Sequence, residues 1–323
     1  MLEGEQLDDK RPDSTKEWKI IEKTMLQMSA EHRRSRRWGI FFKLLTFTYL
    51  FVLLYMFNVG VDNAASSKSG AHTAIVDVSG VIAVNQDAAA DVIVTGLRGA
   101  FEDKNTKGII LRINSPGGSP VQSGYVYDEI KRLKGIYPDT MLYAVIGDIG
   151  ASGAYYIAAA ADEIYADKAS LVGSIGVTAA GFGFVDTLEK VGVKRRSYTS
   201  GEHKGFLDPF SPEKEEEVEF WKTVLTTTHN QFIGKVKEGR GQRLKDDPKL
   251  FSGLVWSGEQ ALDLGLIDGL GSPGYVAREI VGEENIVDFT SKPDPFEKFT
   301  QRLGASIGSA ISNSVVSGAM KLQ

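Results

Sequence analysis

One long apolar run interrupts an otherwise mixed pattern of polar and apolar residues. It covers residues 39–59, reads GIFFKLLTFTYLFVLLYMFNV, and contains Lys43 as its single charge. A helix of this length spans roughly 31 Å, about the thickness of the hydrocarbon core of a bilayer. The pattern therefore predicts one transmembrane helix. A cleaved signal peptide and a buried core helix are the alternatives, and the length of the run disfavours both.

The charges on the two sides of this run are unequal, and this predicts its orientation. The cluster Arg33-Arg34-Ser35-Arg36-Arg37 precedes it, whereas Asp62 and Lys68 are the only charges in the ten residues after it. Because cytoplasmic segments are enriched in Lys and Arg, the polar leader before the run is predicted to be cytoplasmic and everything after residue 60 extracytoplasmic. The leader contains a predicted short helix over Ser14–Ser29.

From residue 73 the pattern alternates between two kinds of segment. Short apolar runs predict strands, and runs with helical periodicity between them predict helices. The predicted strands are Ala74–Ile82, Gly108–Ile113, Met141–Ile146, Glu163–Ala166 and Leu171–Val177, and the predicted helices are Ala88–Glu102, Val121–Lys134, Ser152–Ala161 and Phe184–Val191. Strands that are apolar on both faces and separated by helices indicate an α/β fold with a parallel sheet covered on both sides.

Helices dominate the pattern after residue 210. A long charged helix is predicted over Pro212–Glu238 with Ser211 as its N-cap, and shorter helices follow over Gly258–Leu264 and Gly274–Val281. The acidic run Glu213–Glu219 lies in the first turns of the long helix, where we expect it to be solvated and matched to the helix dipole.

These patterns together predict five parts of the chain. They are a cytoplasmic polar leader (1–38), a transmembrane helix (39–59), a flexible tether rich in Ser, Gly, Ala and Asn (60–72), one globular domain (73–290), and a C-terminal amphipathic or flexible tail (291–323).

The composition excludes several kinds of function. The 42% hydrophobic and 24% charged fractions are those of a globular protein, and a net charge of −5 argues against a nucleic-acid partner. Cysteine is absent, which excludes disulfides, thiol catalysis and cysteine-ligated metals. Acidic residues lack metal-ligand spacing and no nucleotide-binding loop is present, so we expect no metal and no cofactor.

A serine in a glycine-rich turn is the first candidate for chemistry. Ser152 lies in Gly150-Ala151-Ser152-Gly153-Ala154, after a buried strand and at the start of a helix. Ligands of α/β sheets bind at this end of the strands, and the pattern is close to the G-x-S-x-G nucleophile elbow although it lacks the last glycine. The alternative is an ordinary N-cap serine.

A second glycine-rich turn, Asn114-Ser115-Pro116-Gly117-Gly118, also ends a strand and opens a helix. Adjacent glycines let the backbone approach a substrate and turn its amides outward, where they can stabilise an oxyanion. The alternative is a tight turn without a ligand, since Pro-Gly-Gly is common in turns.

A nucleophilic serine needs a base, and the chain offers two kinds. His32 and His72 lie in the leader and tether, which leaves His203 and His229 for a Ser-His hydrolase. Lys204 in Ser200-Gly201-Glu202-His203-Lys204 is the other candidate. A lysine acts as a base where burial lowers its pKa from about 10.4 to near 7–8, whereas most loop lysines are solvated. Ser174 has a hydroxyl that orients a neutral amine or satisfies a backbone group.

Taken in this order, five motifs resemble those of the SppA-type signal peptide peptidases, serine peptidases of the Clp/crotonase superfold. The matching pieces are Asn114-Ser115-Pro116-Gly117-Gly118, Ala151-Ser152-Gly153-Ala154-Tyr155-Tyr156, Gly173-Ser174-Ile175-Gly176-Val177, Ser200-Gly201-Glu202-His203-Lys204 and Trp256-Ser257-Gly258-Glu259-Gln260-Ala261 with Gly265-Leu266-Ile267-Asp268. The resemblance covers residues 73–290 and implies a Clp/crotonase-like ββα-repeat fold, preceded here by one transmembrane helix.

The resemblance also implies the roles of individual residues. Ser152 is the expected nucleophile and Lys204 the expected general base. The amides of Gly118 and Gly153 form the oxyanion hole, and Ser174 hydrogen bonds to the lysine amine. His203 is then a bystander, because the family's dyad does not use histidine.

Partners and location follow from the same resemblance. We expect a single-pass protein of the bacterial inner membrane with a periplasmic peptidase domain that cleaves signal peptides and other extended apolar peptides. Short members of the family form octameric rings in which serine and lysine come from neighbouring protomers. Two other functions stay open: a crotonase-like acyl-CoA enzyme, and a non-catalytic oligomeric scaffold in the membrane.

Overall fold

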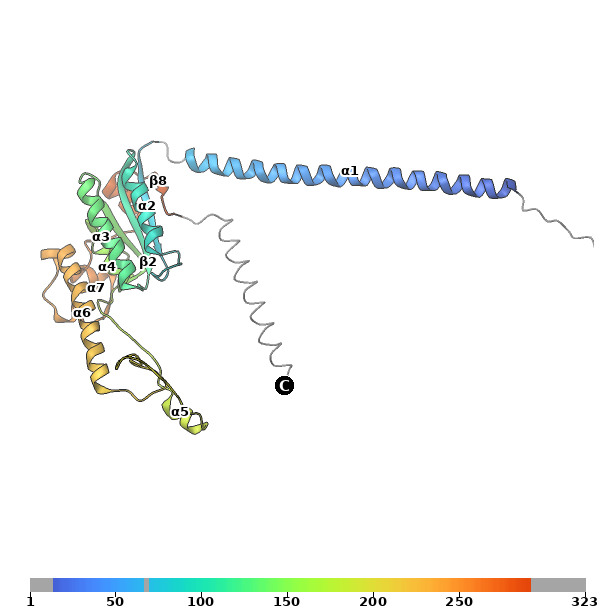
Figure 1. The fold of residues 1–323 in the computed structure, drawn as a ribbon. Helices are drawn as coiled ribbons and strands as arrows, with labels where there is room; N and C mark the ends of the chain where they lie inside the picture. The colour runs from blue at the N-terminus through green and yellow to red at the C-terminus, as the bar shows by residue number, and fades with distance from the viewer. Residues whose placement is uncertain (1–13, 67–69, 292–323) are drawn as a thin grey trace, which may run out of the picture. The chain divides into compact units, whose positions relative to one another are not determined.

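The computed structural model describes residues 14–66 and 70–291 (Figure 1). The chain divides into two compact units, Met1–Lys68 and Ser69–Gln323. The start of the predicted leader and nearly all of the predicted C-terminal tail lie outside the described residues, so those predictions are untested.

The first unit contains one long helix, α1 (Ser14–Ser66). Its segment Arg36–Leu54 is long and apolar enough to cross a membrane, with a mean hydropathy of 1.5, and no other helix in the described part of the chain meets that test. The helix is longer than the sequence predicts, because it joins the leader to the span and continues through the first residues of the predicted tether. No proline interrupts residues 14–66, and the leader is rich in strong helix formers.

The second unit is built on a largely parallel sheet. Its strands are β1 (His72–Ser79), β2 (Thr106–Ser115), β3 (Leu142–Ala151), β4 (Glu163–Ala166), β5 (Leu171–Gly173), β6 (Val255–Ser257), β7 (Gly269–Leu270) and β8 (Ile286–Asp288). The order is β6-β5-β3-β2-β1-β8, with β4 beside β3 and β7 beside β4, and only β5 and β6 pair antiparallel. The predicted α/β class is confirmed. The last three strands have two or three residues each, too few for a detectable period.

Two predicted bounds differ from the observed ones for different reasons, backbone geometry in the first and burial in the second. The predicted strand Leu171–Val177 stops at Gly173, because Gly173 (φ 106°) and Ser174 (φ 53°) leave the β region. At the other end of the sheet, His72 is the first residue of β1 and is fully buried, rather than part of a tether.

Strand β3 changes its partner along its length. Tyr143–Ile146 pairs with β4, and Ile149–Ala151 pairs with β5. The buried hydroxyl of Ser170 donates to the carbonyl of Gly147 at the fork. The carboxyl end of β3 thus runs beside β5, where Ala151 pairs with Gly173.

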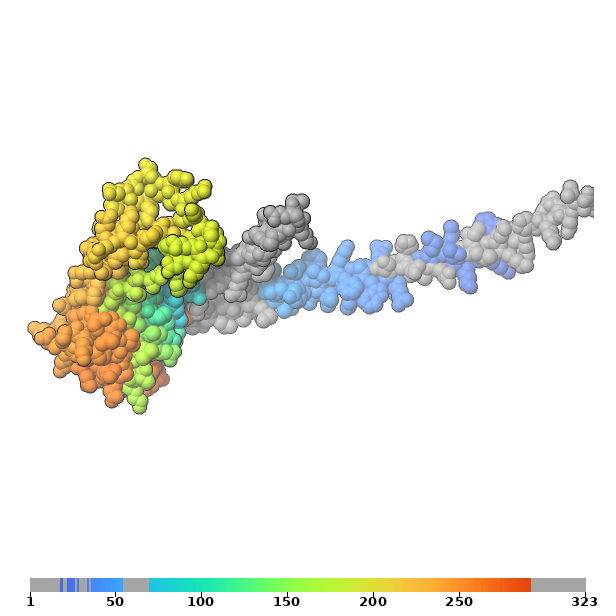
Figure 2. All heavy atoms as spheres, turned by 90° about the horizontal axis from the view of Figure 1, so that it is seen from below, coloured from blue at the N-terminus to red at the C-terminus, as the bar shows by residue number. Residues whose placement is uncertain are grey.

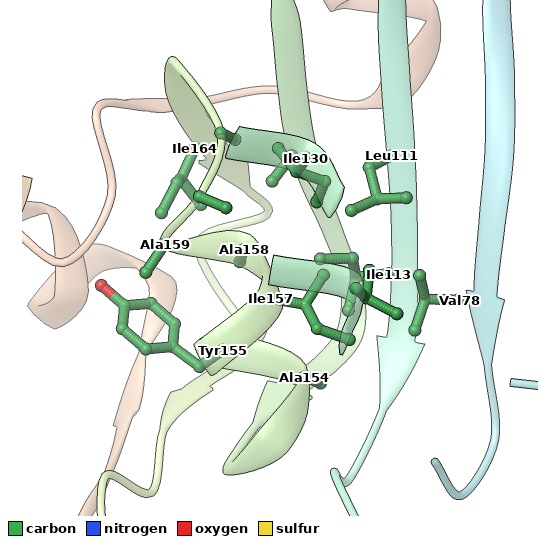
Figure 3. Close-up of a cluster of buried hydrophobic side chains, with 14 of the residues drawn as sticks. Val78, Leu111, Ile113, Ile130, Ala154, Tyr155, Ile157, Ala158, Ala159 and Ile164 are labelled. Atoms are coloured by element: carbon green, nitrogen blue, oxygen red, sulfur yellow. The ribbon is translucent and has the colours of Figure 1, made fainter. Parts of the chain in front are cut away.

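Helices cover both faces of the sheet. The main core lies between the sheet and α2 (Ala90–Glu102), α3 (Pro120–Ile136) and α4 (Gly153–Ala158). Figure 3 shows Ile157 of α4 pointing toward Ile113 and Val78 of the strands. A smaller core on the opposite face packs Ile75, Ile110, Tyr143, Val145 and Tyr165 against Val276 and Ala277. These last two residues belong to a π-helical turn, Val276–Val281, that follows α8 (Pro273–Tyr275).

A segment of few regular elements, residues 176–214, projects beyond the sheet and is called the arm below (Figures 1 and 2). It contains α5 (Val185–Lys190) and leads into α6 (Glu215–Arg240). Large apolar side chains of the arm lie in solvent: Phe182 is 82% and Tyr198 90% exposed. The other end of α6 is anchored in the main core by Phe232 and Val236.

The chain after α6 returns to the sheet through short elements. They are two 3₁₀ turns (Gly241–Arg243 and Pro248–Phe251), β6, and α7 (Gly258–Asp263), which Ser257 and Gln260 cap reciprocally. The predicted cap of α6 was wrong, because Lys214 and not Ser211 is its N-cap; the Ser211 hydroxyl donates to Asp208 instead.

Candidate active site

The turn between β3 and α4 carries Ser152 in an unusual backbone conformation. Its φ of 55° and ψ of −126° lie outside the regions that a residue with a side chain ordinarily adopts. Its amide donates to the carbonyl of Gly173 at 2.8 Å, which holds the turn against β5. Strain of this kind costs about 1–3 kcal/mol and persists at functional sites because the surroundings impose it. The turn leaves the Ser152 side chain partly accessible to solvent.

The Pro-Gly-Gly turn packs directly against this serine. A Cβ at Gly117 would lie 2.8 Å from the Ser152 Cβ and 2.7 Å from the Gly153 nitrogen, so only glycine fits at this position. The buried Ser115 hydroxyl accepts a hydrogen bond from the Gly117 amide at 3.1 Å, and the Gly117 carbonyl accepts one from the Ile82 amide at 2.9 Å. These bonds fix the turn on both sides.

Two backbone amides next to Ser152 have no acceptor among the described residues. Gly153 is the first residue of α4, so its N–H has no partner within the helix. The Gly118 amide donates to no described residue, and a Cβ added at Gly153 would lie only 3.4 Å from it. The two donors therefore lie side by side next to Ser152, an arrangement that can stabilise an oxyanion in acyl transfer.

Replacing Gly117 with alanine tests this geometry. The added methyl group would displace the Gly153 amide or Ser152 itself, and loss of an oxyanion donor costs about 10²–10³ in kcat. We expect a loss of that size in peptide hydrolysis with little change in KM. Gly124→Ala on α3 is the matched control, because a Cβ there meets no atom within 4 Å and activity should stay unchanged. Wild-type kcat in Gly117→Ala would contradict the arrangement.

A cavity of about 440 Å³ opens at Ser152. Four of the five residues predicted for the site line it: Gly118, Ser152, Gly153 and Ser174. Side chains of α6 form another wall, among them Thr228 and Phe232. The strand pairing explains how Ser174 arrives, because Ala151 and Gly173 are partners and the two serines follow them.

Lys204 is the fifth predicted residue, and it does not line this cavity. It is exposed, in a loop that docks on the start of α6. Phe206 packs edge-on against Phe220 and Trp221, and the Leu207 amide donates to Glu217 at 3.3 Å. The loop that carries the lysine is thus tied to the first turns of α6.

The length of α6 separates this loop from the cavity. From Glu217, which holds the loop, to Thr228, which lines the cavity, the helix rises about 16 Å at 1.5 Å per residue. A fully extended lysine side chain reaches only about 6 Å from its Cα, because its five bonds of about 1.5 Å follow a zigzag. Within one copy of the chain, the described structure therefore does not bring the Lys204 amine to the Ser152 hydroxyl.

Glu217 is buried, in contrast to the solvated position that its acidic run predicts. The prediction of a solvated acidic run is wrong at this position, because the side chain is only 6% exposed. It accepts hydrogen bonds from the Lys214 ammonium at 3.1 Å and from the Leu207 amide, and the Lys214 hydrogen bond lowers the pKa of the Glu217 carboxyl. Its position one turn before Trp221, on the packing face of the helix, was the signal in the sequence.

The two candidate histidine bases, His203 and His229, lie apart from Ser152. His203 shares the lysine loop, with its Nδ1 3.8 Å from Glu217, and His229 places its Nε2 3.1 Å from the carbonyl of Ile175. Neither lines the cavity.

Ser123 also lines the cavity, although the sequence does not predict it as a site residue. Its hydroxyl donates to the Ser119 carbonyl at 3.0 Å, beside Gly153. Ser123 follows the Ser119 N-cap of α3 by four residues, about one helical turn, so the sequence places the two serines on one face of that helix.

One family model and several relatives in the comparisons are peptidases or proteases. The model of peptidase family S49 matches residues 139–286. A putative signal peptide peptidase SppA of Enterococcus faecium is 32% identical over 196 residues, 61% of this chain and 56% of that protein. The putative protease MJ0651 of Methanocaldococcus jannaschii is 30% identical over 216 residues, 65% of this chain and 68% of that protein.

A third relative is named as an antiporter and not as a peptidase. A Na(+)/H(+) antiporter NhaA of Brucella abortus is 48% identical over 188 residues, which are 58% of this chain but only 25% of the antiporter. The chain thus spans between a quarter and about half of the length of several relatives that it matches.

Proposed function

Because the chain belongs to peptidase family S49 and is an SppA-type peptidase, we propose that it is a membrane-anchored serine endopeptidase with a Ser-Lys dyad. Ser152 is the nucleophile, and Lys204 of a neighbouring copy is the general base. The observation that carries this proposal is the strained Ser152 beside the two free amides of Gly118 and Gly153 in an open cavity.

The chemistry follows from these groups. The Ser152 oxygen attacks the peptide carbonyl while the lysine amine takes its proton, and the two amides bind the oxygen that becomes negative. The C–N bond breaks, the leaving amine takes the proton from the lysine, and an acyl-enzyme is left. Water then attacks the ester carbonyl and gives a proton to the lysine. The bond between the carbonyl carbon and the Ser152 oxygen breaks, and the lysine returns the proton to Ser152 as the acid product leaves.

A general base needs a neutral amine close to Ser152, whereas Lys204 of the same copy is solvated and remote. A lysine from another copy would meet both requirements. In a single copy the Lys204 loop is solvated and docked on α6 far from the cavity. A general base must be neutral, and transfer of an ammonium into a cavity from which water is excluded favours the neutral amine. Insertion of the arm into the cavity of a neighbouring copy would supply that environment and would also cover Phe182 and Tyr198, which lie in solvent here. An octameric ring is the assembly that the family resemblance implies.

The substrates and the membrane topology are part of the same proposal. The Arg36–Leu54 segment of α1 anchors the chain in the bacterial inner membrane, with the basic cluster before it in the cytoplasm and the peptidase domain in the periplasm. Substrates are cleaved signal peptides and similar apolar peptides, which bind in extended form along the cavity. No nucleic acid is involved.

Covalent labelling tests the nucleophile. A fluorophosphonate probe should label the full chain in detergent, with the modification at Ser152 by mass spectrometry, and Ser152→Ala should not be labelled. Ser252→Ala is the matched control and should still react, because Ser252 lines the same cavity but its hydroxyl donates to the Lys249 carbonyl at 2.7 Å. An acyl-CoA enzyme without a serine nucleophile, or a scaffold with no reactive serine, would give no labelling, and either result would overturn the proposal.

A further inference from the structure

The leader part of α1 carries an apolar stripe that the peptidase function does not use. Trp18, Ile21, Met25 and Met28 follow one another at spacings of three, four and three residues and are called the leader seam below. The helix is continuous here, and the side chains of Trp18, Met25 and Met28 are 69%, 68% and 55% exposed. Leu26 is also exposed, at 61%, and lies beside this row. Exposed apolar side chains that gather along a helix in this way indicate a surface that a partner covers.

The spacing of the seam identifies the kind of partner. Apolar residues at alternating steps of three and four are the a and d positions of a heptad, and such a row packs knobs-into-holes against a helix with the same row. A second copy of this chain supplies that row. We propose that the leader helices of neighbouring copies form a parallel coiled coil through the leader seam, on the cytoplasmic side of the membrane.

The continuity of α1 favours a second copy over the membrane surface. The helix runs without a break from Ser14 through Arg36–Leu54, so the leader extends along the axis of the span instead of turning into the plane of the bilayer. An amphipathic helix must lie in that plane to bury its apolar face. Copies inserted in the same orientation hold their leaders parallel and close together, which raises their effective concentration.

The charges beside the leader seam favour a parallel pair of helices at one position and disfavour it at another. With Trp18 at position a, Lys19 and Lys23 occupy positions b and f, on the side away from the seam. Glu31 at g and Arg36 at e have the spacing of an attractive interhelical ion pair, whereas Glu17 at g and Glu22 at e repel. The coiled coil is also short, so membrane anchoring is required for it to form.

Cysteine cross-linking tests the seam directly, because the chain contains no cysteine. The full chain is expressed in membranes with one substitution at a time and treated with a mild oxidant. Met25→Cys and Met28→Cys should form disulfide-linked dimers, since a and d side chains face their counterparts within disulfide distance. Lys19→Cys and Lys23→Cys are the controls and should form at least several-fold less. Equal cross-linking at all four positions, or none at Met25 and Met28, would overturn the inference.

Exchanging the charges beside the leader seam gives a second test. A substitution that merely destabilised the helix would not be rescued by a second one, whereas a restored ion pair would rescue cross-linking. In the Met25→Cys background, Glu31→Arg and Arg36→Glu should each slow dimer formation by about twofold, the worth of one surface ion pair on a helix. The double exchange should restore it, and Glu22→Lys should accelerate it by converting the repulsive pair. A double exchange that is slower than either single change would contradict the register.

The outcome is independent of the peptidase proposal. Cross-linking of the seam should be the same in Ser152→Ala, which lacks the nucleophile. Intact peptide cleavage without seam cross-linking would overturn only the coiled coil, and seam cross-linking without cleavage would overturn only the peptidase.

Discussion

Peptide hydrolysis by the full chain is expected to fall by about 10⁴-fold or more in kcat when Ser152 is replaced by alanine, and by a similar factor in Lys204→Met. Groups that act as one unit in nucleophilic catalysis lose nearly the whole rate when either is removed. Methionine keeps the length and the apolar stem of the lysine but cannot accept a proton. The loss should lie in kcat, because neither group holds the substrate in its ground state.

The neighbouring residues of Lys204 provide matched controls for this result. His203→Ala removes the adjacent side chain of the same exposed loop and should leave kcat within about twofold, since His203 lies with its Nδ1 3.8 Å from Glu217 and does not line the cavity. The full set is measured as initial rates on an apolar leader peptide, with circular dichroism to confirm folding. A large loss in His203→Ala with a small loss in Lys204→Met would favour a Ser-His hydrolase.

The second large effect is on stability and concerns the end of α6. Arg240 is fully buried and donates two hydrogen bonds to Asp268, at 2.6 and 3.0 Å, and one to the Gly265 carbonyl. Asp268 in turn accepts from the Ile164 amide at 2.7 Å, which links the pair to β4. Breaking a buried ion pair by removing one partner costs about 3–5 kcal/mol. We expect Arg240→Met to lower the free energy of unfolding by about 3 kcal/mol, because Arg243 still contacts Asp268 at 3.1 Å.

Urea unfolding followed by circular dichroism measures this loss. Lys222→Met is the matched control, since it removes a cation of the same helix whose pair with Glu219 is exposed on both sides, and the expected cost is at most about 0.5 kcal/mol. Equal losses in the free energy of unfolding for the two changes would show that the buried ion pair stabilises the fold no more than the exposed one does.

The same pair predicts the effect of acid. Burial raises the pKa of Asp268, but hydrogen bonds and charge from Arg240 outweigh it, so the carboxyl ionises below its usual range. A lowered folded-state pKa stabilises the fold above the unfolded pKa near 4 and loses that contribution as the pH falls through the folded value. The stability difference between wild type and Arg240→Met should therefore shrink below about pH 4.

The local parts of the site could be predicted from the sequence. Both glycine-rich turns follow strands whose apolar pattern is strong, so the sequence predicts Ser152 and Gly118 at the carboxyl ends of strands. The structure adds the features that depend on pairing. The fork of β3 brings Ser174 beside Ser152, and the lack of space at Gly117 shows why that turn requires glycine.

The position of Lys204 could not be predicted in this way. The lysine loop is fixed by tertiary contacts of Phe206 and Leu207 with the start of α6, and no periodicity in the sequence reports them. The length of α6 then sets the separation between the loop and the cavity. The short strands β6, β7 and β8 also have no signal of their own, because they are defined by their pairing with β5, β4 and β1 and not by a period in the sequence.

The claim that serine and lysine come from different copies is tested most directly by mixing two inactive variants. Ser152→Ala and Lys204→Met are co-expressed in equal amounts with different affinity tags, and oligomers that carry both tags are purified. About a quarter of wild-type activity is expected, because half of the sites contain an intact Ser152 and half of these meet an intact Lys204. Mixed oligomers as inactive as each variant alone would contradict the account.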